Sequence, residues 1–263
     1  MSDRAGVPSS HAKELQGSGR TVAGLNALGL VLAVFLMRPG APLVPLDDRL
    51  AFLAAAPLGW TLGWGVWLLA ALALVRFFWH LLRDSVTRER HANLARLALG
   101  LVLLGAAVDV SCDVLQIVLL PEAAAEALRT QDSASFQFLE RALWGGGVIC
   151  GCGLYCSATL LTTASRWGEL LWISRVSGLG TGLGGLLWVG AELAQARALL
   201  EPATALTVGA FVLWAATLTR RPAPLRPTPL RPTPLRPTPR RPTPLRPTPL
   251  PAGLDAESSP SPG

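Results

Sequence analysis

The stretch LALGLVLLGAAVDVSCDVLQIVLL, residues 97–120, decides the fold because it is long and apolar enough to cross a bilayer. It nevertheless carries Asp109, Asp113 and Gln116. On an α-helix these three side chains share one stripe, because residues three and four apart lie on the same face. Carboxyl groups are costly against lipid, so we expect the stripe to face a helix bundle or a water-filled cavity.

Apolar runs of similar length recur along the chain and define its class. The chain has 263 residues, of which 51% are apolar, and a mean hydropathy of +0.42. Each run is long enough to span about 30 Å of hydrocarbon. The sequence therefore predicts an all-α, polytopic integral membrane protein with about six transmembrane helices in one bundle.

The chain divides into a tail, a bundle and a second tail. Residues 1–20 predict a disordered cytoplasmic N-terminal tail, residues 21–218 a six-helix transmembrane domain, and residues 219–263 a Pro/Arg-rich tail. A signal peptide is the alternative for the first apolar run, but no small-residue cleavage site follows it, so we expect an uncleaved span. The expected spans are residues 21–37, 58–81, 97–120, 142–163, 176–194 and 203–218.

The segments between the spans carry further structural signals. Asp47 or Asp48 can cap a short helix over residues 48–56 that suits the membrane interface. We expect Pro121 to end the third span, because proline removes a backbone hydrogen bond inside a helix. Residues 121–140 then form an acidic connector before the fourth span.

Basic residues are more frequent in alternate segments, which predicts the orientation. Residues 1–20, 83–96, 164–175 and 219–263 hold three, four, two and eight Lys or Arg, whereas the connectors of the opposite side hold two, two and one. By the positive-inside rule, both termini face the cytoplasm. The preference for Arg over Lys, with abundant Ala, Gly and Pro, is typical of GC-rich bacteria, so we expect a multi-pass protein of the bacterial inner membrane, the cell membrane.

The formal net charge of +6 arises in the C-terminal tail. Residues 1–218 hold 15 basic and 15 acidic residues, so the bundle gives no argument for nucleic-acid binding. Residues 221–250 repeat the unit RPTPL with small variations, which forbids a helix and favours polyproline II. Such an arm could lie on anionic lipid headgroups or bind a proline-recognising partner. We favour a low-complexity spacer without a dedicated role.

Asp109 and Asp113 are the first candidates for chemistry. Two carboxyl groups one helical turn apart in a low dielectric do not both ionise readily. With Gln116 they could hold and pass a proton or bind a cation. The alternative is that protonated acids and Gln116 form hydrogen bonds that only hold the helices together. We favour the functional interpretation, with Cys112 and Glu192 as accessory candidates.

Tryptophan and glycine faces are the second feature of the spans. Trp60, Trp64 and Trp67 share one face of the second span, where they could stack on a ligand. We favour the simpler interpretation of interfacial tryptophans combined with close helix packing through small residues. The candidates for helix packing are Gly59, Gly63, Gly178 and Gly182.

The sequence predicts no metal and no cofactor. On a helix Cys152 and Cys156 share a face while Cys150 points nearly opposite, so the three thiols cannot converge on one ion, and we expect buried, inert cysteines. A GxGxxG match at residues 180–185 lies in an apolar span with no strand before it, which excludes a dinucleotide site.

Three functional hypotheses remain. The first is a small proton- or cation-linked transporter or channel that uses the intramembrane carboxyl pair. The second is a structural or assembly protein whose glycine and tryptophan faces bind another membrane protein or a second copy of the chain. The third is an enzyme acting on lipid, for which only Asp84, Glu89 and His91 in the loop 83–96 are available. No catalytic motif is present, which favours a role other than catalysis.

Overall fold

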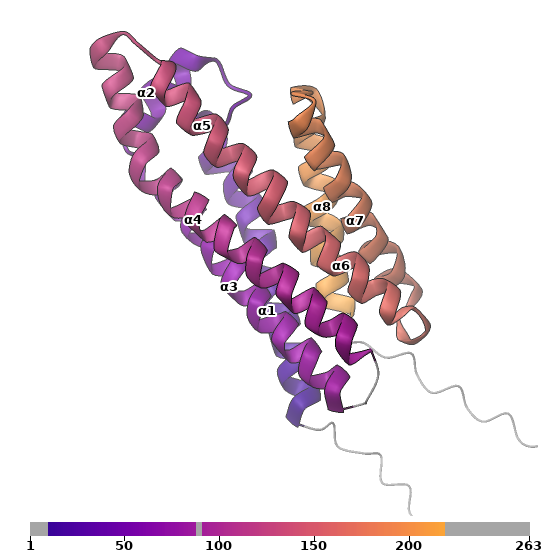
Figure 1. Cartoon of the computed structure of the whole chain (residues 1–263). Coiled ribbons are helices and arrows are strands. Elements are labelled where there is room, and N and C mark those ends of the chain that lie inside the picture. The colour runs from indigo at the N-terminus through magenta and orange to yellow at the C-terminus, as the bar shows by residue number, and fades with distance from the viewer. Residues whose placement is uncertain (1–9, 88–90, 219–263) are drawn as a thin grey trace, which may run out of the picture. The chain divides into compact units, whose positions relative to one another are not determined.

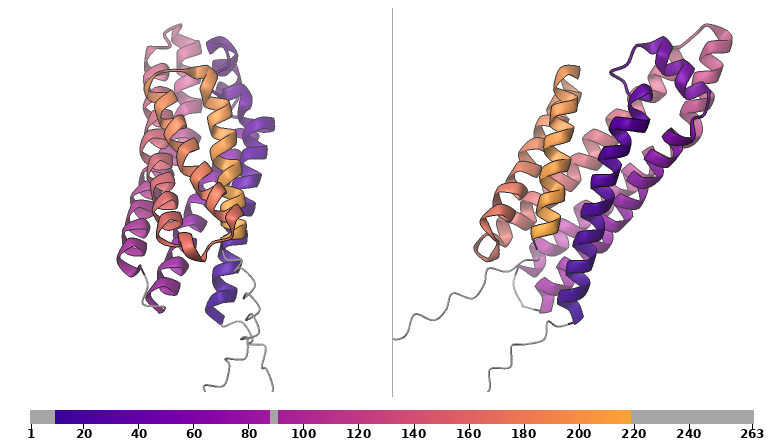
Figure 2. Two further views of the ribbon diagram at one scale, coloured as in Figure 1. Left: turned by 90° about the vertical axis from the view of Figure 1, so that its right-hand side faces the viewer. Right: turned by 180° about the vertical axis from the view of Figure 1, so that it is seen from behind.

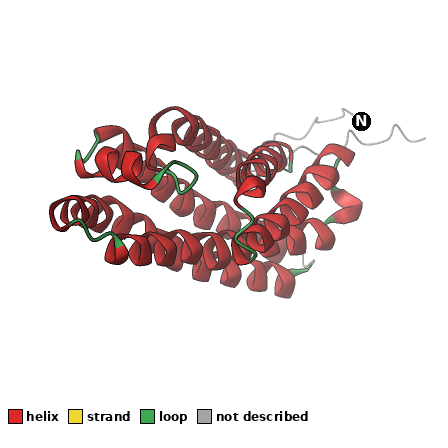
Figure 3. Ribbon diagram, turned by 90° about the horizontal axis from the view of Figure 1, so that it is seen from above, coloured by secondary structure: helices red, strands yellow, loops and turns green. Residues whose placement is uncertain are grey.

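The computed structural model describes residues 10–87 and 91–218. The described residues contain helices and no strand, which confirms the all-α prediction for them (Figure 3). The predicted C-terminal tail and the first part of the N-terminal tail lie outside the described residues. The elements in chain order are α1 (Ser10–Leu32), η1 (Ala33–Met37), η2 (Arg38–Gly40), α2 (Leu46–Ala54), α3 (Leu58–Thr87), α4 (Ala92–Thr130), α5 (Ala134–Gly146), η3 (Gly147–Cys152), α6 (Gly153–Ser165), η4 (Trp167–Glu169), α7 (Trp172–Leu193) and α8 (Arg197–Thr217).

The long helices form a ring in which each packs against the next. α1 packs against α3, α3 against α4, and α4 against both α5 and α6 (Figure 1). α6 packs against α7, α7 against α8, and α8 returns to α1. The short helix α2 lies against α4. α1 and α8 lie close together at the end of the bundle where α1 begins and α8 ends, and they diverge toward the opposite end (Figure 2).

Five helices are long and apolar enough to cross a membrane, and they indicate a membrane protein. They are His11–Gly40, Leu58–Thr87, Ala92–Thr130, Ala134–Ser165 and Ala198–Thr217. α7 is not among these five, although it has 22 residues and packs along α8. It contains six glycines and carries Arg175 and Glu192 near its two ends.

The first helix begins earlier than the sequence predicted. α1 starts at Ser10 and not at Thr21, so residues 10–20 are helical and not an unstructured tail. The reason is packing, because Leu15 and Ser18 are buried although their segment is polar overall. Gly19 is the point of closest approach, since a Cβ atom there would lie 2.8 Å from the backbone oxygen of Ala215 in α8.

The expected stop at Pro121 is wrong, because α4 continues through this proline to Thr130. On either side of it, Leu120, Ala124 and Ala127 are buried in an apolar cluster with side chains of α2 and α5. That burial offsets the cost of about 3 kcal/mol that proline carries inside a helix. α4 ends where Gln131 takes a left-handed φ of 57°, and most of the expected connector 121–140 is therefore helical.

The other boundaries shift outward by several residues. The expected fourth span begins at Ala134 and contains a π-helical turn, η3, between α5 and α6. α3 continues to Thr87, α7 begins at Trp172 and α8 at Arg197. The interfacial helix is present as α2, but its N-cap is Pro45, without a side-chain cap, so the capping role expected for Asp47 or Asp48 is wrong.

Three apolar clusters hold the ring together and leave a space between them. One cluster lies where α1, α3 and α8 meet and includes Phe77, Phe78 and Trp214. A second joins η1, α2, α3, α4 and α5, and a third joins η3, α7 and α8. The second and third clusters lie toward the end of the bundle where α1 and α8 diverge.

Close helix contacts through glycine predict a testable difference within α7. A Cβ atom at Gly182 would overlap the side chain of Leu160 in α6, whereas one at Gly190 would meet no atom within 4 Å. We expect Gly182→Ala to lower the free energy of unfolding by about 1–3 kcal/mol through overpacking. Gly190→Ala should leave it unchanged or raise it slightly, since alanine favours helix. Reversible unfolding in mixed micelles measures both, and equal effects would contradict the packing described here.

Candidate functional site

A large cavity lies inside the ring of helices. Its volume is about 660 Å³, which is within the range of cavities that hold small organic ligands. Side chains from α1, α3, α4, α5, α6, α7 and α8 line it, as do both π-helical turns, η1 and η3. π-Helical turns often occur at functional sites because they redirect the side chains of a helix. The cavity is therefore built by most of the bundle and not by one helix pair.

The polar stripe of α4 faces this cavity. Asp109, Asp113 and Gln116 all line it, so the three residues of the predicted stripe lie together along one wall. Asp113 is only 2% exposed and Gln116 only 3%. The Oδ2 atom of Asp113 is buried and has no hydrogen-bond partner. A buried carboxyl oxygen without a partner is costly, and this atom needs a ligand, a proton or water to satisfy it.

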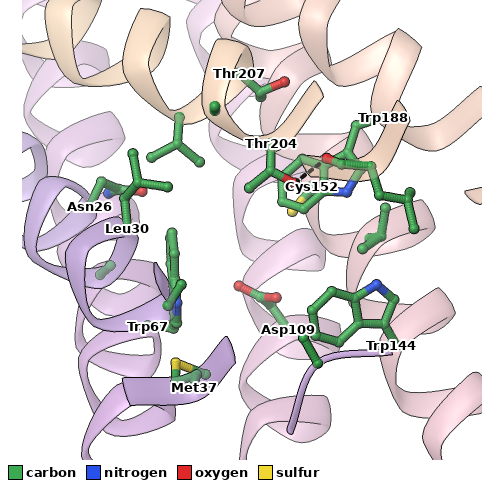
Figure 4. A pocket seen from close by; sticks show the side chains of 18 of the residues that line it. Asn26, Leu30, Met37, Trp67, Asp109, Trp144, Cys152, Trp188, Thr204 and Thr207 are labelled. Atoms are coloured by element: carbon green, nitrogen blue, oxygen red, sulfur yellow. Dashed lines mark hydrogen bonds between the residues drawn. The ribbon is translucent and has the colours of Figure 1, made fainter. Parts of the chain in front are cut away.

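Asp109 is hydrogen-bonded to α6, a helix that packs directly against α4. The hydroxyl group of Tyr155 in α6 donates a hydrogen bond to Asp109 Oδ2 over 3.2 Å. Gly151 in η3 leaves room for the acid, since a Cβ atom there would lie 3.0 Å from Asp109 Oδ1. Gly105 likewise leaves room for the ring of Tyr155. In Figure 4 the carboxyl group of Asp109 points into the cavity, with Trp67 on one side and Trp144 on the other.

Tryptophans form much of the cavity wall. Trp60, Trp64 and Trp144 make consecutive edge-to-face contacts, with ring centroids 5.6 Å and 6.1 Å apart. The indole of Trp67 lies against Gly29 of α1, where a Cβ atom would be 3.0 Å from the ring. Trp188 lines the wall contributed by α7. The predicted tryptophan face of the second span thus faces the interior of the bundle.

Among the tryptophans that line the cavity, one indole N–H group has a hydrogen-bond partner and three are buried without one. Trp60 Nε1 donates to the backbone oxygen of Gln116 over 3.0 Å, which fixes α3 against α4 beside the acids. The Nε1 atoms of Trp64, Trp144 and Trp188 are buried without a partner. By contrast, the cavity-lining Thr204 bonds its own helix, with Oγ1 2.7 Å from the Leu200 oxygen. The unmet hydrogen bonds are thus concentrated on the aromatic walls and the acid.

Exposed residues line the cavity at the end of the bundle where α1 and α8 diverge. We call this the open end, where Arg38 and Glu201 line the cavity and form an exposed ion pair of 3.8 Å. The opposite, closed end carries the start of α1 and the end of α8. There Phe211 forms the floor, and its ring lies 5.7 Å from that of Trp214. Trp214 in turn contacts the rings of Phe77 and Phe78 at 5.9 Å and 6.1 Å.

The charges on the cavity wall are mainly negative. Asp109, Asp113 and Glu201 are acidic, and Arg38 is the only basic residue among the described residues that line the cavity. Arg38 lies at the open end and pairs there with Glu201. The carboxyl pair on α4 therefore has no basic side chain on the cavity wall at its own depth. Arg175, near the closed end, lies over the ring of Trp167 instead.

The accessory candidates lie beside the cavity and do not line it. Cys112 is buried next to Gly146, where a Cβ atom would be 3.4 Å from its sulfur. Glu192 is also buried, and its Oε1 atom lies against Gly145 of α5. Cys152 and Cys156 do line the cavity, but Cys150 is exposed on the outside of the bundle, so the expectation that it is buried is wrong.

The predicted packing glycines are covered by side chains of the same chain. Cβ atoms at Gly59 and Gly63 would meet Leu36 and Met37 of η1. Cβ atoms at Gly178 and Gly182 would meet side chains of α6 and, for Gly178, of α8. These glycine faces therefore serve contacts inside the bundle.

Two of the three enzyme candidates in the loop 83–96 lie among the described residues. Asp84 is paired with Arg166 over 2.9 Å at the closed end. His91 precedes α4 with a left-handed φ of 54°, and Glu89 lies outside the described residues. In the described ranges 10–87 and 91–218, no group of three or more His, Cys, Asp or Glu residues could hold a metal ion.

Comparison with known proteins gives no relative for this chain. No family model matches it, and neither the curated proteins nor the solved structures contain a match. The class of protein is accordingly defined by the structure alone: residues 10–87 and 91–218 are mainly helical and include five helices able to cross a membrane.

Sequence reasoning missed several residues of the cavity wall. Tyr155 is the only tyrosine of the chain, and Trp144 and Trp188 lie within apolar runs. Tryptophan and tyrosine in membrane proteins gather at the interfaces. Aromatic residues with a polar group inside a span are therefore unusual. This signal could have marked Tyr155 and Trp188, but not Trp144, which lies at the start of the expected span 142–163.

The unpartnered oxygen of Asp113 predicts the effect of its removal on stability. We expect Asp113→Asn to leave the free energy of unfolding in detergent unchanged or to raise it, because the amide is neutral and of equal size. Asp84→Asn should lower it by about 1–3 kcal/mol, because it removes one member of a largely buried ion pair. Thermal unfolding compares the two variants with the wild type. A clear loss of stability in Asp113→Asn would show that this acid only holds the bundle together.

Proposed function

We propose that the protein is a small proton- or cation-linked membrane transporter whose site is formed by Asp109, Asp113 and Gln116. The observation that carries the proposal is the unpartnered carboxyl oxygen of Asp113 in a cavity that reaches the open end. Acids inside a membrane domain are expensive and usually line pathways for ions, protons or substrates. In this proposal α7 also crosses the membrane, as the fifth of six spans, and both termini face the cytoplasm, so the cavity opens on the opposite side.

The aromatic floor of the cavity favours a transporter over a channel. A channel needs a path through the whole bundle, whereas here Phe211, Trp214 and the two phenylalanines of α3 fill the ring below the site. A site open to one side and closed to the other is the arrangement that alternating access requires. Opening the closed end would need α8 to move away from α1 at Gly19 and Ala215, where their backbones come closest.

The glycine and tryptophan faces named for the alternative role, an assembly protein, are not free on the outside of the bundle. That role depended on glycine and tryptophan faces being free to bind a partner. Gly63 and Gly182 are covered within the chain, and Trp60, Trp64 and Trp67 line the cavity. The cavity therefore favours the transport hypothesis.

Ion flux in liposomes tests the proposal. Purified protein is reconstituted into liposomes that contain a pH-sensitive dye or, in separate experiments, a sodium-sensitive dye, and a potassium diffusion potential, negative inside, drives entry of protons or sodium. We expect the wild type to accelerate flux of one of the two ions, and Asp113→Asn to reduce that rate at least about tenfold, because it removes the titratable group.

A carboxyl group on the same helix provides the matched control. Glu122 is exposed on α4 and does not line the cavity, so Glu122→Gln should transport at the wild-type rate. Wild-type rates equal to those of empty liposomes for both ions would contradict the proposal. An Asp113→Asn rate equal to that of the wild type would contradict it equally.

A further inference from the structure

We propose that the cavity binds an amphipathic organic cation, held by the carboxyl pair of α4 and by the surrounding tryptophans. This inference rests on the proposed transport function, since it names the class of substrate that the same site would carry. It is drawn from the walls of the cavity, which the ion-linked mechanism alone does not explain.

The charge of the wall selects the sign of the ligand. Asp109 and Asp113 lie on the cavity wall without a basic residue at their depth, and Arg38 is paired at the open end. A ligand with a positive centre would compensate an ionised carboxylate there, whereas an anion would add repulsion. Asp109 and Asp113 both line the cavity, so a positive centre there would lie beside their carboxyl groups.

The aromatic walls select an organic ion over a metal ion. Trp60, Trp64, Trp67, Trp144 and Trp188 all line the cavity. Indole faces attract cations electrostatically, and rings of aromatic residues are the usual receptors for ammonium groups with apolar substituents. A small metal cation instead needs about six oxygen ligands, which a wall built largely of indole rings and aliphatic side chains does not provide.

A lipid acyl chain is the alternative occupant of the cavity. It is apolar and uncharged, so it would leave an ionised carboxylate on the wall without compensation.

Two ions of matched size and opposite charge provide the test. Tetraphenylphosphonium and tetraphenylborate have closely similar shapes and differ in the sign of their charge. We expect calorimetric titration of the purified protein in detergent to show binding of tetraphenylphosphonium at least about tenfold tighter than that of tetraphenylborate. The ions are titrated separately, because they pair with each other.

Variants identify the site. Asp113→Asn should weaken tetraphenylphosphonium binding at least about tenfold, and Trp67→Leu about 2- to 30-fold, the range of a cation–π contact. The matched control is Trp79→Leu on the same helix, since Trp79 is half exposed and does not line the cavity, and it should bind as the wild type does. Size-exclusion profiles establish that each variant is folded.

Other results of the binding and flux experiments would contradict either the cation site or the transport function. Equal affinity for the two ions, or binding unaffected by Asp113→Asn, would overturn the cation site. Absence of tetraphenylphosphonium binding, with co-purified phospholipid in the cavity, would assign it to an acyl chain instead. Ion flux that depends on Asp113 without cation binding would leave the transport function standing and remove this inference. Tetraphenylphosphonium binding that depends on Asp113 and Trp67, without any ion flux, would leave the cation site standing and remove the transport function.

Discussion

The burial of two carboxyl groups on one face of α4, away from any basic residue of the cavity wall, is the constraint on which the rest of the structure depends. A helix carrying Asp109 and Asp113 cannot turn this face to lipid at acceptable cost. The face must point to the inside of a ring of helices, and the ring must leave a space that satisfies the acids. The cavity of about 660 Å³ provides that space, and Asp113 Oδ2 remains without a protein partner in it.

The ring achieves this space by packing tightly at one end and separating at the other. At the closed end, glycine at position 19 and the aromatic side chains around Trp214 bring α1, α3 and α8 together. Toward the open end, the π-helical turns η1 and η3 change the course of two helices, and both turns line the cavity. Apolar clusters pack both halves of the ring, and four of the residues with a buried, unpartnered polar atom line the cavity, whereas Trp214 lies at the closed end.

The sequence predicted the class of fold because hydropathy is a local property. Runs of apolar residues located the helices, and a 3.6-residue period placed Asp109, Asp113 and Gln116 on one stripe. Helix ends were less predictable, because tertiary contacts decide them: buried Leu15 extends α1, and buried Ala124 carries α4 past Pro121. The walls contributed by α5 to α8 could not be predicted at all. Which helices adjoin α4 is a property of the assembled ring, and one sequence does not show it.

Thiol labelling measures whether water and ions reach the acids from one side of the membrane only. Thr204 lines the cavity on α8, and Leu213 of the same helix is exposed on the outside of the bundle. In a background with the four native cysteines replaced by alanine, Thr204→Cys is treated with a membrane-impermeant trimethylammonium thiosulfonate from each side of the membrane. We expect the reagent to modify Thr204→Cys from the side that carries Arg38 and not from the other side. Leu213→Cys, the control, should stay unmodified from both sides. Failure of Thr204→Cys to react from either side, or equal reaction from both, would contradict access from one side only.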